Sequence, residues 1–404
     1  MADSIGIPAL FQSKDKCCGC GACMNVCPRR AISMREDEYG FIYPQIEEGL
    51  CIGCERCKQV CAFQNRKTSN HVINVYAAAT KEKDVIVRSA SGGIFATLAN
   101  KWVDNGGIVF GAAFKSDWGV HHISVVNREE ICKLQGSKYT QSSTEHTFQE
   151  VKQLLQQGRK VLYSGTPCQI AGLYGYLGKR DENLATIDIV CHGVPSNRMF
   201  QEYLKLVGER RGGEIADFTF RDKSAGWGKN GKAEFGLSKG NRTAIIWSSA
   251  SSYLSYFGNG WICRDSCYNC PYACDHRPAD LTLGDYWGIE KAHPEYLGRG
   301  GFNEAEGISL ILVNTEKGQR ILERNRECME LRQSDFDKAS ERNMQLRQPS
   351  EKGRRDEILE AYLQGGWRAV DKIFYKNVGW KKYSSQIKAL MPLELKRKIK
   401  GKMA

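Results

Sequence analysis

The sequence contains no apolar run near the about 20 residues that a membrane-spanning helix needs. Its first residues, "MADSIGIPALFQSKDK", lack the charged start and long apolar core of a secretory signal. It has no helix-turn-helix, RNA-binding or zinc-finger signature, and no G-x-G-x-x-G that leads from an expected strand into an expected helix, as in the Rossmann type. We therefore expect a cytoplasmic protein that binds no nucleic acid.

Cysteine and positive charge, by contrast, are abundant. The 404 residues include 17 cysteines and carry a formal net charge of +12, while the hydrophobic content of 41% is typical of a soluble globular protein. So many cysteines in a cytosolic chain favour metal or redox chemistry over disulfides. The positive excess would attract acidic proteins, anionic cofactors or lipid headgroups.

Eight of the cysteines form two copies of one spacing, C-x2-C-x2-C-x3-C, at residues 17–27 and 51–61. In such runs three thiolates hold one iron–sulfur cube and the fourth reaches the other cube. We predict one [4Fe–4S] cluster on Cys17, Cys20, Cys23 and Cys61, and a second on Cys51, Cys54, Cys57 and Cys27. A pair of zinc sites is the alternative, although zinc requires only two shorter cysteine pairs per ion. Cys18 is interpreted as a bystander.

The composition and hydrophobic patterning along the chain predict three parts and an α+β fold. Residues 1–66 form a small ferredoxin-like head with two clusters, and the polar segment 64–74 ends it. Residues 72–330 alternate strand and helix patterns, with strands expected at 74–80 and 108–114. Residues 331–404 are expected to form a helical basic tail.

Function in such sheets gathers where strands end and helices begin, because free N–H groups there hold anions. Three short segments rich in Ser, Thr, Gly and Cys meet this description: 89–93, 164–168 and 191–196. Ser89 or Ser91 is expected to cap a helix over 88–107. Thr166 is expected to cap a second helix that has proline at its first position.

A further cysteine group lies in "CRDSCYNCPYAC", residues 263–274. Two ligand sets fit a third metal site. One is local and the other gathers from three strand ends: Cys263, Cys267, Cys270 and Cys274, or Cys168, Cys191, Cys267 and Cys270. Zinc competes with an iron–sulfur cluster here, because C-x3-C-x2-C is not diagnostic.

Five motifs in one order resemble a known family. They are "SASGG" (89–93), "GSKYTQS" (136–142), "GTPCQIAGL" (165–173), "CHGVPS" (191–196) and "CYNCPY…RPADLTLGDYWG" (267–288). Over about residues 72–330 the chain resembles the beta subunit of coenzyme F420-reducing hydrogenase and its dehydrogenase relatives. Residues 13–66 resemble bacterial two-cluster ferredoxins.

The resemblance implies a mixed α/β domain that holds FAD and a third [4Fe–4S] cluster. It implies FAD near Ser91, Gly92 and Gly93, with Lys138, Tyr139 and Thr166 around the ring system. It also favours the dispersed ligand set Cys168, Cys191, Cys267 and Cys270. From the residues themselves, His192 is a candidate proton donor and Asp285 a candidate acceptor that orients the third site.

The expected function is that of an iron–sulfur flavoprotein oxidoreductase. It would pass electrons between [4Fe–4S] clusters and FAD to reduce or oxidise a small substrate, with a ferredoxin or flavodoxin-like carrier or a redox partner subunit as its partner. The alternatives are an electron-transfer subunit without its own substrate, an F420-dependent reductase, and a non-redox protein stabilised by clusters. The basic end of the chain is expected to pack on the domain or to make peripheral membrane contact.

Overall fold

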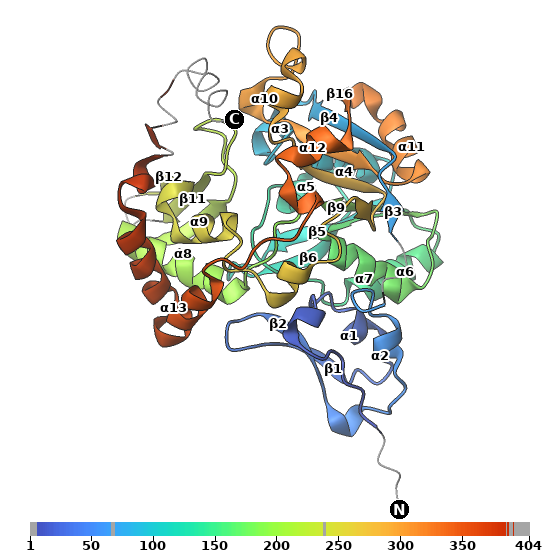
Figure 1. Cartoon of the computed structure of the whole chain (residues 1–404). Helices are drawn as coiled ribbons and strands as arrows, with labels where there is room; N and C mark the ends of the chain where they lie inside the picture. The colour runs from blue at the N-terminus through green and yellow to red at the C-terminus, as the bar shows by residue number, and fades with distance from the viewer. Residues whose placement is uncertain (1–5, 66–68, 237–239, 385, 388–390, 392–404) are drawn as a thin grey trace, which may run out of the picture.

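A nine-stranded mixed sheet forms the centre of the molecule, with the cysteine-rich head at one end and a smaller lobe beside it (Figure 1). This computed structural model describes residues 6–65, 69–236, 240–384, 386–387 and 391. Within them, no helix is long and apolar enough to cross a membrane. The arrangement agrees with the α+β class expected from the sequence.

The central sheet combines parallel and antiparallel pairs. In spatial order its strands are β16 (Met329–Ser334), β4 (Asn74–Thr80), β15 (Ser309–Val313), β14 (Leu281–Asp285), β9 (Leu184–Ile189), β8 (Val161–Gly165), β5 (Ile108–Phe114), β6 (Val120–Val125) and β7 (Ser142–Ser143). The four strands β14, β9, β8 and β5 run parallel to one another. Their apolar runs are buried on both faces, as parallel strands require.

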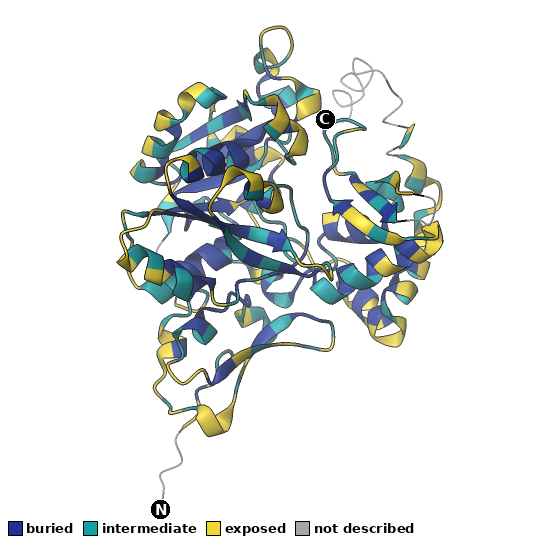
Figure 2. Cartoon of the chain, turned by 180° about the vertical axis from the view of Figure 1, so that it is seen from behind, coloured by how far each residue is buried: buried dark blue, intermediate teal, exposed yellow. Residues whose placement is uncertain are grey.

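Helices pack on both faces of this sheet, and Figure 2 shows large parts of its strands in the colour of buried residues. On one face, Val109 of β5 packs with α4 (Ile94–Asp104) and α5 (Arg128–Leu134). On the other face, Phe110 packs with α6 (Thr147–Gln156) and α7 (Pro167–Leu177). The alternation follows from the two-residue period of a strand. The remaining helices around the sheet are α3 (Lys83–Arg88), α10 (Ile289–Ala292), α11 (Glu316–Arg324) and α12 (Phe336–Glu341).

The head consists of a hairpin and two short helices. Its elements are α1 (Ala22–Val26), β1 (Ile32–Glu36), β2 (Ile42–Ile46) and α2 (Arg56–Gln59). The head rests on α7, where two glycines leave room for it. A Cβ at Gly172 would lie 2.6 Å from the Sγ of Cys20, and one at Gly175 would lie 2.3 Å from the carbonyl oxygen of Val60.

The lobe beside the sheet has its own core of aromatic side chains. Its elements are α8 (Asn197–Arg211), β10 (Glu214–Thr219), β11 (Gly231–Gly236), β12 (Arg242–Ile246), α9 (Ser252–Gly258) and α13 (Arg355–Val378). Tyr253 and Trp367 lie in this core, and Phe41 of the head joins it. A separate two-residue pairing joins β3 (Asn70–His71) to β13 (His276–Arg277).

Two expectations about elements differ from the structure. The helix expected over 88–107 is preceded by a short turn: α4 begins at Ile94 behind Gly93, whose φ of 83° is left-handed, so neither serine caps it. The segment after residue 330 is not all helix, because it opens within β16, which pairs with β4. Residues 388–390 and 392–404 of the expected helical basic tail lie outside the described residues.

Candidate functional site

The first cysteine run meets the last cysteine of the second run beside α7. Burial raises the pKa of the Cys17 thiol to about 11, and neighbouring Cys20 and Cys61 add to this rise, which the Arg264 guanidinium opposes. Burial likewise raises the pKa of Cys23, again with Cys20, Cys17 and Cys61 close by. The predicted set of Cys17, Cys20, Cys23 and Cys61 is therefore brought together. Such buried sulfur atoms become thiolates only when a cation replaces their protons.

The second predicted set also converges. Its four members line one small cavity together with Ile32 and Ile46 of the hairpin: Cys27, Cys51, Cys54 and Cys57. The backbone N–H of Ala31 donates to the Sγ of Cys27 over 3.3 Å. Four sulfur donors in one cavity form a soft ligand set, which suits an iron–sulfur cluster or zinc.

A third cavity lies between the head and the central sheet, and the dispersed cysteines line it: Cys168, Cys191, Cys267 and Cys270. Cys168 is the second residue of α7, Cys191 follows β9, and the other two belong to the short 3-10 helix η4 (Asp265–Asn269) and its end. The expected helix start is confirmed here, since Thr166 caps α7 and Pro167 is its first residue. The Oγ1 of Thr166 lies 3.2 Å from the Sγ of Cys168.

Two cysteines of the local alternative set do not line this cavity. The Sγ of Cys263 faces the carbonyl oxygen of His192 at 3.8 Å and is packed against Gly193. The Sγ of Cys274 faces the carbonyl oxygens of Pro271 and His276 instead. The structure thus gathers the dispersed set and leaves the local set divided.

Cys18, which the sequence suggests is a bystander, lines the third cavity as well. Its buried thiol lies within hydrogen-bonding reach of two sulfur atoms that belong to different predicted clusters, those of Cys20 and Cys168. Hydrogen bonding to Cys18 lowers the pKa of both neighbours, and the pKa of Cys18 itself is raised. The Cys18 thiol therefore contacts one proposed ligand of the head site, Cys20, and one of the third site, Cys168.

Arg264 provides a test of whether an anionic group fits the third cavity. Its side chain is 1% exposed, donates to the carbonyl oxygens of Cys17 and Ile42, and stacks over Tyr43. Its Nε, however, is buried and has no hydrogen-bond partner. A cube held by four thiolates carries net negative charge, so the residues present fit such a group.

A larger cavity of about 300 Å³ opens over the ends of β8, β9 and β14. This volume lies within the range of small-molecule pockets. Six of the predicted cofactor or proton-donor residues line it: Ser91, Gly93, Lys138, Tyr139, Thr166 and His192. Gly92 does not; it packs instead against Ala78 and Ser309, where a Cβ would lie 2.4 Å from a backbone oxygen.

Two polar groups at this cavity are poised for a ligand. The Oγ of Ser91 is buried and has no hydrogen-bond partner. The Nζ of Lys138 donates to the carbonyl oxygens of Gln135 and Gly136, and burial lowers the pKa of this lysine to about 7. An anionic or acceptor-rich ring system would satisfy both, so the cavity fits the flavin that the sequence resemblance implies.

Sequence reasoning missed one main feature of the cavity wall, the pair formed by Arg221 and Asp285. The guanidinium donates to both carboxylate oxygens, over 2.7 and 3.0 Å, and it also donates to the hydroxyl of Tyr139 over 3.1 Å. The indole of Trp227 donates to Asp285 as well, and Trp287 lies under the guanidinium. Asp285 thus orients Arg221 at the large cavity, whereas the sequence suggested that it orients the third site.

The large cavity and the third cysteine cavity share one wall. The residues that line both are Ser142, Thr166, Gln169, Cys191, His192, Gly193 and Val194. Burial is the main cause that lowers the pKa of His192 to about 4, and the charges of Lys229 and Arg221 contribute to this lowering. At neutral pH the imidazole is therefore uncharged, and the histidine lies between the two cavities.

Comparisons with known proteins found three family models that match the chain. The C-terminal family model of the "Coenzyme F420 hydrogenase/dehydrogenase" beta subunit matches residues 158–338, and its N-terminal counterpart matches residues 75–148. The model "4Fe-4S dicluster domain" matches residues 16–65.

The chain is similar to the F subunit of F(420)H(2) dehydrogenase from Methanosarcina mazei, with 24% identity over 78% of this chain and 84% of that protein. It is also 38% identical to Hydrogenase-4 component A of Escherichia coli, over 15% of this chain and 31% of that protein. A chain from the F420-reducing [NiFe] hydrogenase complex of Methanosarcina barkeri is 16% identical with a TM-score of 0.45, covering 74% of this chain and 94% of that chain. The chain is an iron–sulfur protein of the oxidoreductase type and belongs to the family of coenzyme F420 hydrogenase/dehydrogenase beta subunits.

Proposed function

We propose that the chain is an iron–sulfur flavoprotein oxidoreductase that moves electrons between three [4Fe–4S] clusters and FAD. The observation that carries this proposal is the wall shared by the large cavity and the third cysteine cavity, from Cys191 to Val194. When bound, clusters exchange single electrons and a flavin exchanges electron pairs with a substrate, so adjacent sites for both would link the two modes.

In this proposal the ligands are the head sets and the dispersed third set. The head occupies residues 1–66, the flavin and third-cluster domain 72–330, and the end segment 331–404. Cys17, Cys20, Cys23 and Cys61 hold one head cluster, Cys27, Cys51, Cys54 and Cys57 hold the other, and Cys168, Cys191, Cys267 and Cys270 hold the third.

The cavity residues have distinct tasks. Ser91, Gly93, Tyr139 and Thr166 bind and orient the ring system, and Lys138, when protonated, supplies positive charge to it. The Arg221–Asp285 pair fixes the hydroxyl of Tyr139 and keeps a buried cation at the wall. The uncharged imidazole of His192 is placed to hold or move a proton beside the cluster cavity.

Anaerobic purification of the full chain tests the proposal. We expect about twelve irons, four for each of three clusters, together with a releasable flavin whose absorption bleaches on reduction. The variant Cys191→Ala should lose about four irons and keep the flavin, whereas Cys132→Ala, at an exposed cysteine outside the sites, should lose neither. A colourless protein that holds zinc would overturn the proposal.

A second candidate is an electron-transfer subunit that feeds a larger complex and has no substrate of its own. It is favoured by the names of the relatives, one of which is a dehydrogenase subunit and the other a hydrogenase component. Turnover of a small substrate, or of coenzyme F420, by the isolated chain with reduced ferredoxin would support the enzyme. Reduction of the bound flavin without any turnover, until partner subunits are added, would support the second candidate.

A further inference from the structure

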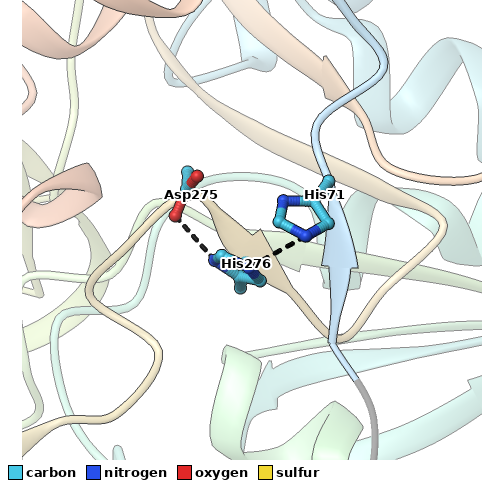
Figure 3. A group of neighbouring side chains, drawn as sticks. All are labelled: His71, Asp275 and His276. Atoms are coloured by element: carbon cyan, nitrogen blue, oxygen red, sulfur yellow. Dashed lines mark hydrogen bonds and ion pairs between the residues drawn. The ribbon is translucent and has the colours of Figure 1, made fainter.

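Two histidines and an aspartate meet at the surface away from the sites above, where β3 pairs with β13 (Figure 3). His71 and His276 are directly opposite each other across these strands, and Asp275 precedes His276. Among the described residues, this is the one group of three or more His, Cys, Asp or Glu side chains whose ligand atoms all lie within 4.8 Å.

The distance between the two rings suits a shared ion. The Nε2 atoms of His71 and His276 are 3.1 Å apart. Two nitrogens bound to one tetrahedral zinc ion at about 2.0–2.1 Å would be separated by about 3.3 Å. A hydrogen bond from one ring to the other also explains the distance, and the experiment below separates these two explanations.

Asp275 prepares His276 for metal binding. Its Oδ1 lies 2.7 Å from Nδ1 of His276, so that nitrogen carries the proton and Nε2 has a free lone pair toward His71. A carboxylate behind a histidine ligand is the usual arrangement at protein metal sites, because it fixes both the tautomer and the orientation of the ring. His71 and His276 can therefore act as ligands through Nε2, while Asp275 orients His276.

The group lies where two segments of the chain pair, the one that leaves the head and the one that leaves the third cysteine group. β3 follows the head along the chain, and β13 follows the loop that carries Cys267 and Cys270. Asn70 on β3 donates to the carbonyl oxygen of Arg277 on β13, and Arg277 is itself buried on Asp188. An ion here would fasten the segment leaving the head to the segment leaving the third cysteine group.

We propose that His71 and His276 bind a first-row divalent transition metal ion of the Zn²⁺ type, with Asp275 orienting His276 and water completing the coordination. Imidazole ligands suit zinc, nickel or copper, whereas Mg²⁺ and Ca²⁺ require oxygen ligands. This site is separate from the cysteine sites and does not depend on the function proposed above.

The test is a calorimetric titration of the anaerobic full chain with Zn²⁺, after treatment with a chelator mild enough to leave its iron in place. We expect one Zn²⁺ per chain, bound in the wild type and lost in His71→Ala and in His276→Ala, and no comparable binding of Mg²⁺. Asp275→Asn should bind about 10–100-fold more weakly. His121→Ala removes a histidine beside Glu145, outside the proposed site, and it should bind like the wild type.

His71→Gln separates the ion from the hydrogen bond, because its amide nitrogen reaches the position of the histidine Nε2 and can donate to His276, but it offers no imidazole ligand. Loss of zinc binding in this variant supports the site, and wild-type binding in it overturns the site. Zinc should also raise the unfolding temperature of the wild type and not that of His71→Gln. Absence of zinc binding in the wild type, or zinc uptake matched by release of iron, would equally overturn the proposal.

Discussion

At the scale of single residues, Cys18 shows how a position next to a motif acquires a role through tertiary contacts. Its spacing matches no ligand pattern, yet its thiol lies between Cys20 and Cys168. Hydrogen bonds to ligand sulfur atoms are among the factors that set cluster potentials. We therefore expect Cys18 to act as a positioning residue between two proposed clusters rather than as a ligand.

We predict that Cys18→Ala retains the full iron content but lowers the reduction potentials of the adjacent clusters, because their sulfur atoms lose a donor. Electron transfer from the head to the flavin should slow in consequence. Redox titration followed by electron paramagnetic resonance measures the potentials. Cys18→Ser keeps a donor and should restore most of the wild-type values; loss of iron in both variants would instead make Cys18 a ligand.

Lys138 gives a prediction about protons. Its pKa of about 7 leaves it mostly uncharged at pH 8.5, and a bound anionic group would raise that pKa. Rebinding of FAD to flavin-depleted protein at pH 8.5 should therefore take up close to one proton, measured by calorimetry in buffers of different ionisation enthalpy. Lys138→Met should abolish this uptake and Lys133→Met, at an exposed lysine, should not; uptake that survives Lys138→Met would assign the proton elsewhere.

The candidate ligands could be predicted from the sequence where all of them lie in short segments of fixed spacing. The head cysteines follow from spacing alone, because a cube demands it. The Arg221–Asp285 pair was not predictable, since the partners are 64 residues apart and only the tertiary fold joins them. The residues alone left two ligand sets open for the third site, and only the family resemblance favoured the dispersed set, whose four cysteines line one cavity of the structure.

At the scale of elements, α7 borders the large cavity, the third cysteine cavity and the head. Its cap Thr166 lines both cavities, Cys168 in its first turn lines the cysteine cavity, and Gly172 and Gly175 in its middle face the head. Glycine at interior helix positions costs about 1 kcal/mol relative to alanine. The contact with the head offsets that cost by allowing the backbones to approach closely.

We predict that Gly175→Ala destabilises the chain, although alanine favours helix, because its Cβ would meet the Val60 carbonyl at 2.3 Å. Displacement of the head should slow electron transfer to the third site while iron content is kept. Thermal unfolding and stopped-flow reduction measure the two effects. Gly49→Ala, at a head glycine with open space around it, is the matched control; a more stable, equally fast Gly175→Ala would contradict the proposed contact.

The elements themselves were predictable to different degrees. Apolar runs bounded by turns gave β4 and β5 with the observed limits. The start of α4 was not evident, because a left-handed glycine, rather than a serine side chain, begins it. β16 escaped notice because its residues are polar and half-buried, and its pairing with β4 joins segments some 250 residues apart.

At the scale of the whole molecule, the net charge of +12 bears on the choice of electron carrier. Opposite charge accelerates encounter, and salt screens it over about 10 Å at 0.1 M. We predict that reduction by an acidic ferredoxin slows as ionic strength rises. Reduction by the cationic dye methyl viologen should not slow; identical salt profiles for both donors, measured by stopped flow, would contradict steering by charge.

The close contact of the head with Gly172 and Gly175 of α7 also limits which ferredoxin-like domains can replace the head, in evolution or in engineering. A foreign two-cluster domain grafted in place of residues 6–65 would carry its own clusters correctly and still fail to deliver electrons, unless its loops match the hollow at Gly172 and Gly175. Compatibility in chimeras should therefore follow the shape of the Cys20 and Val60 loops rather than overall sequence similarity of the donor domain.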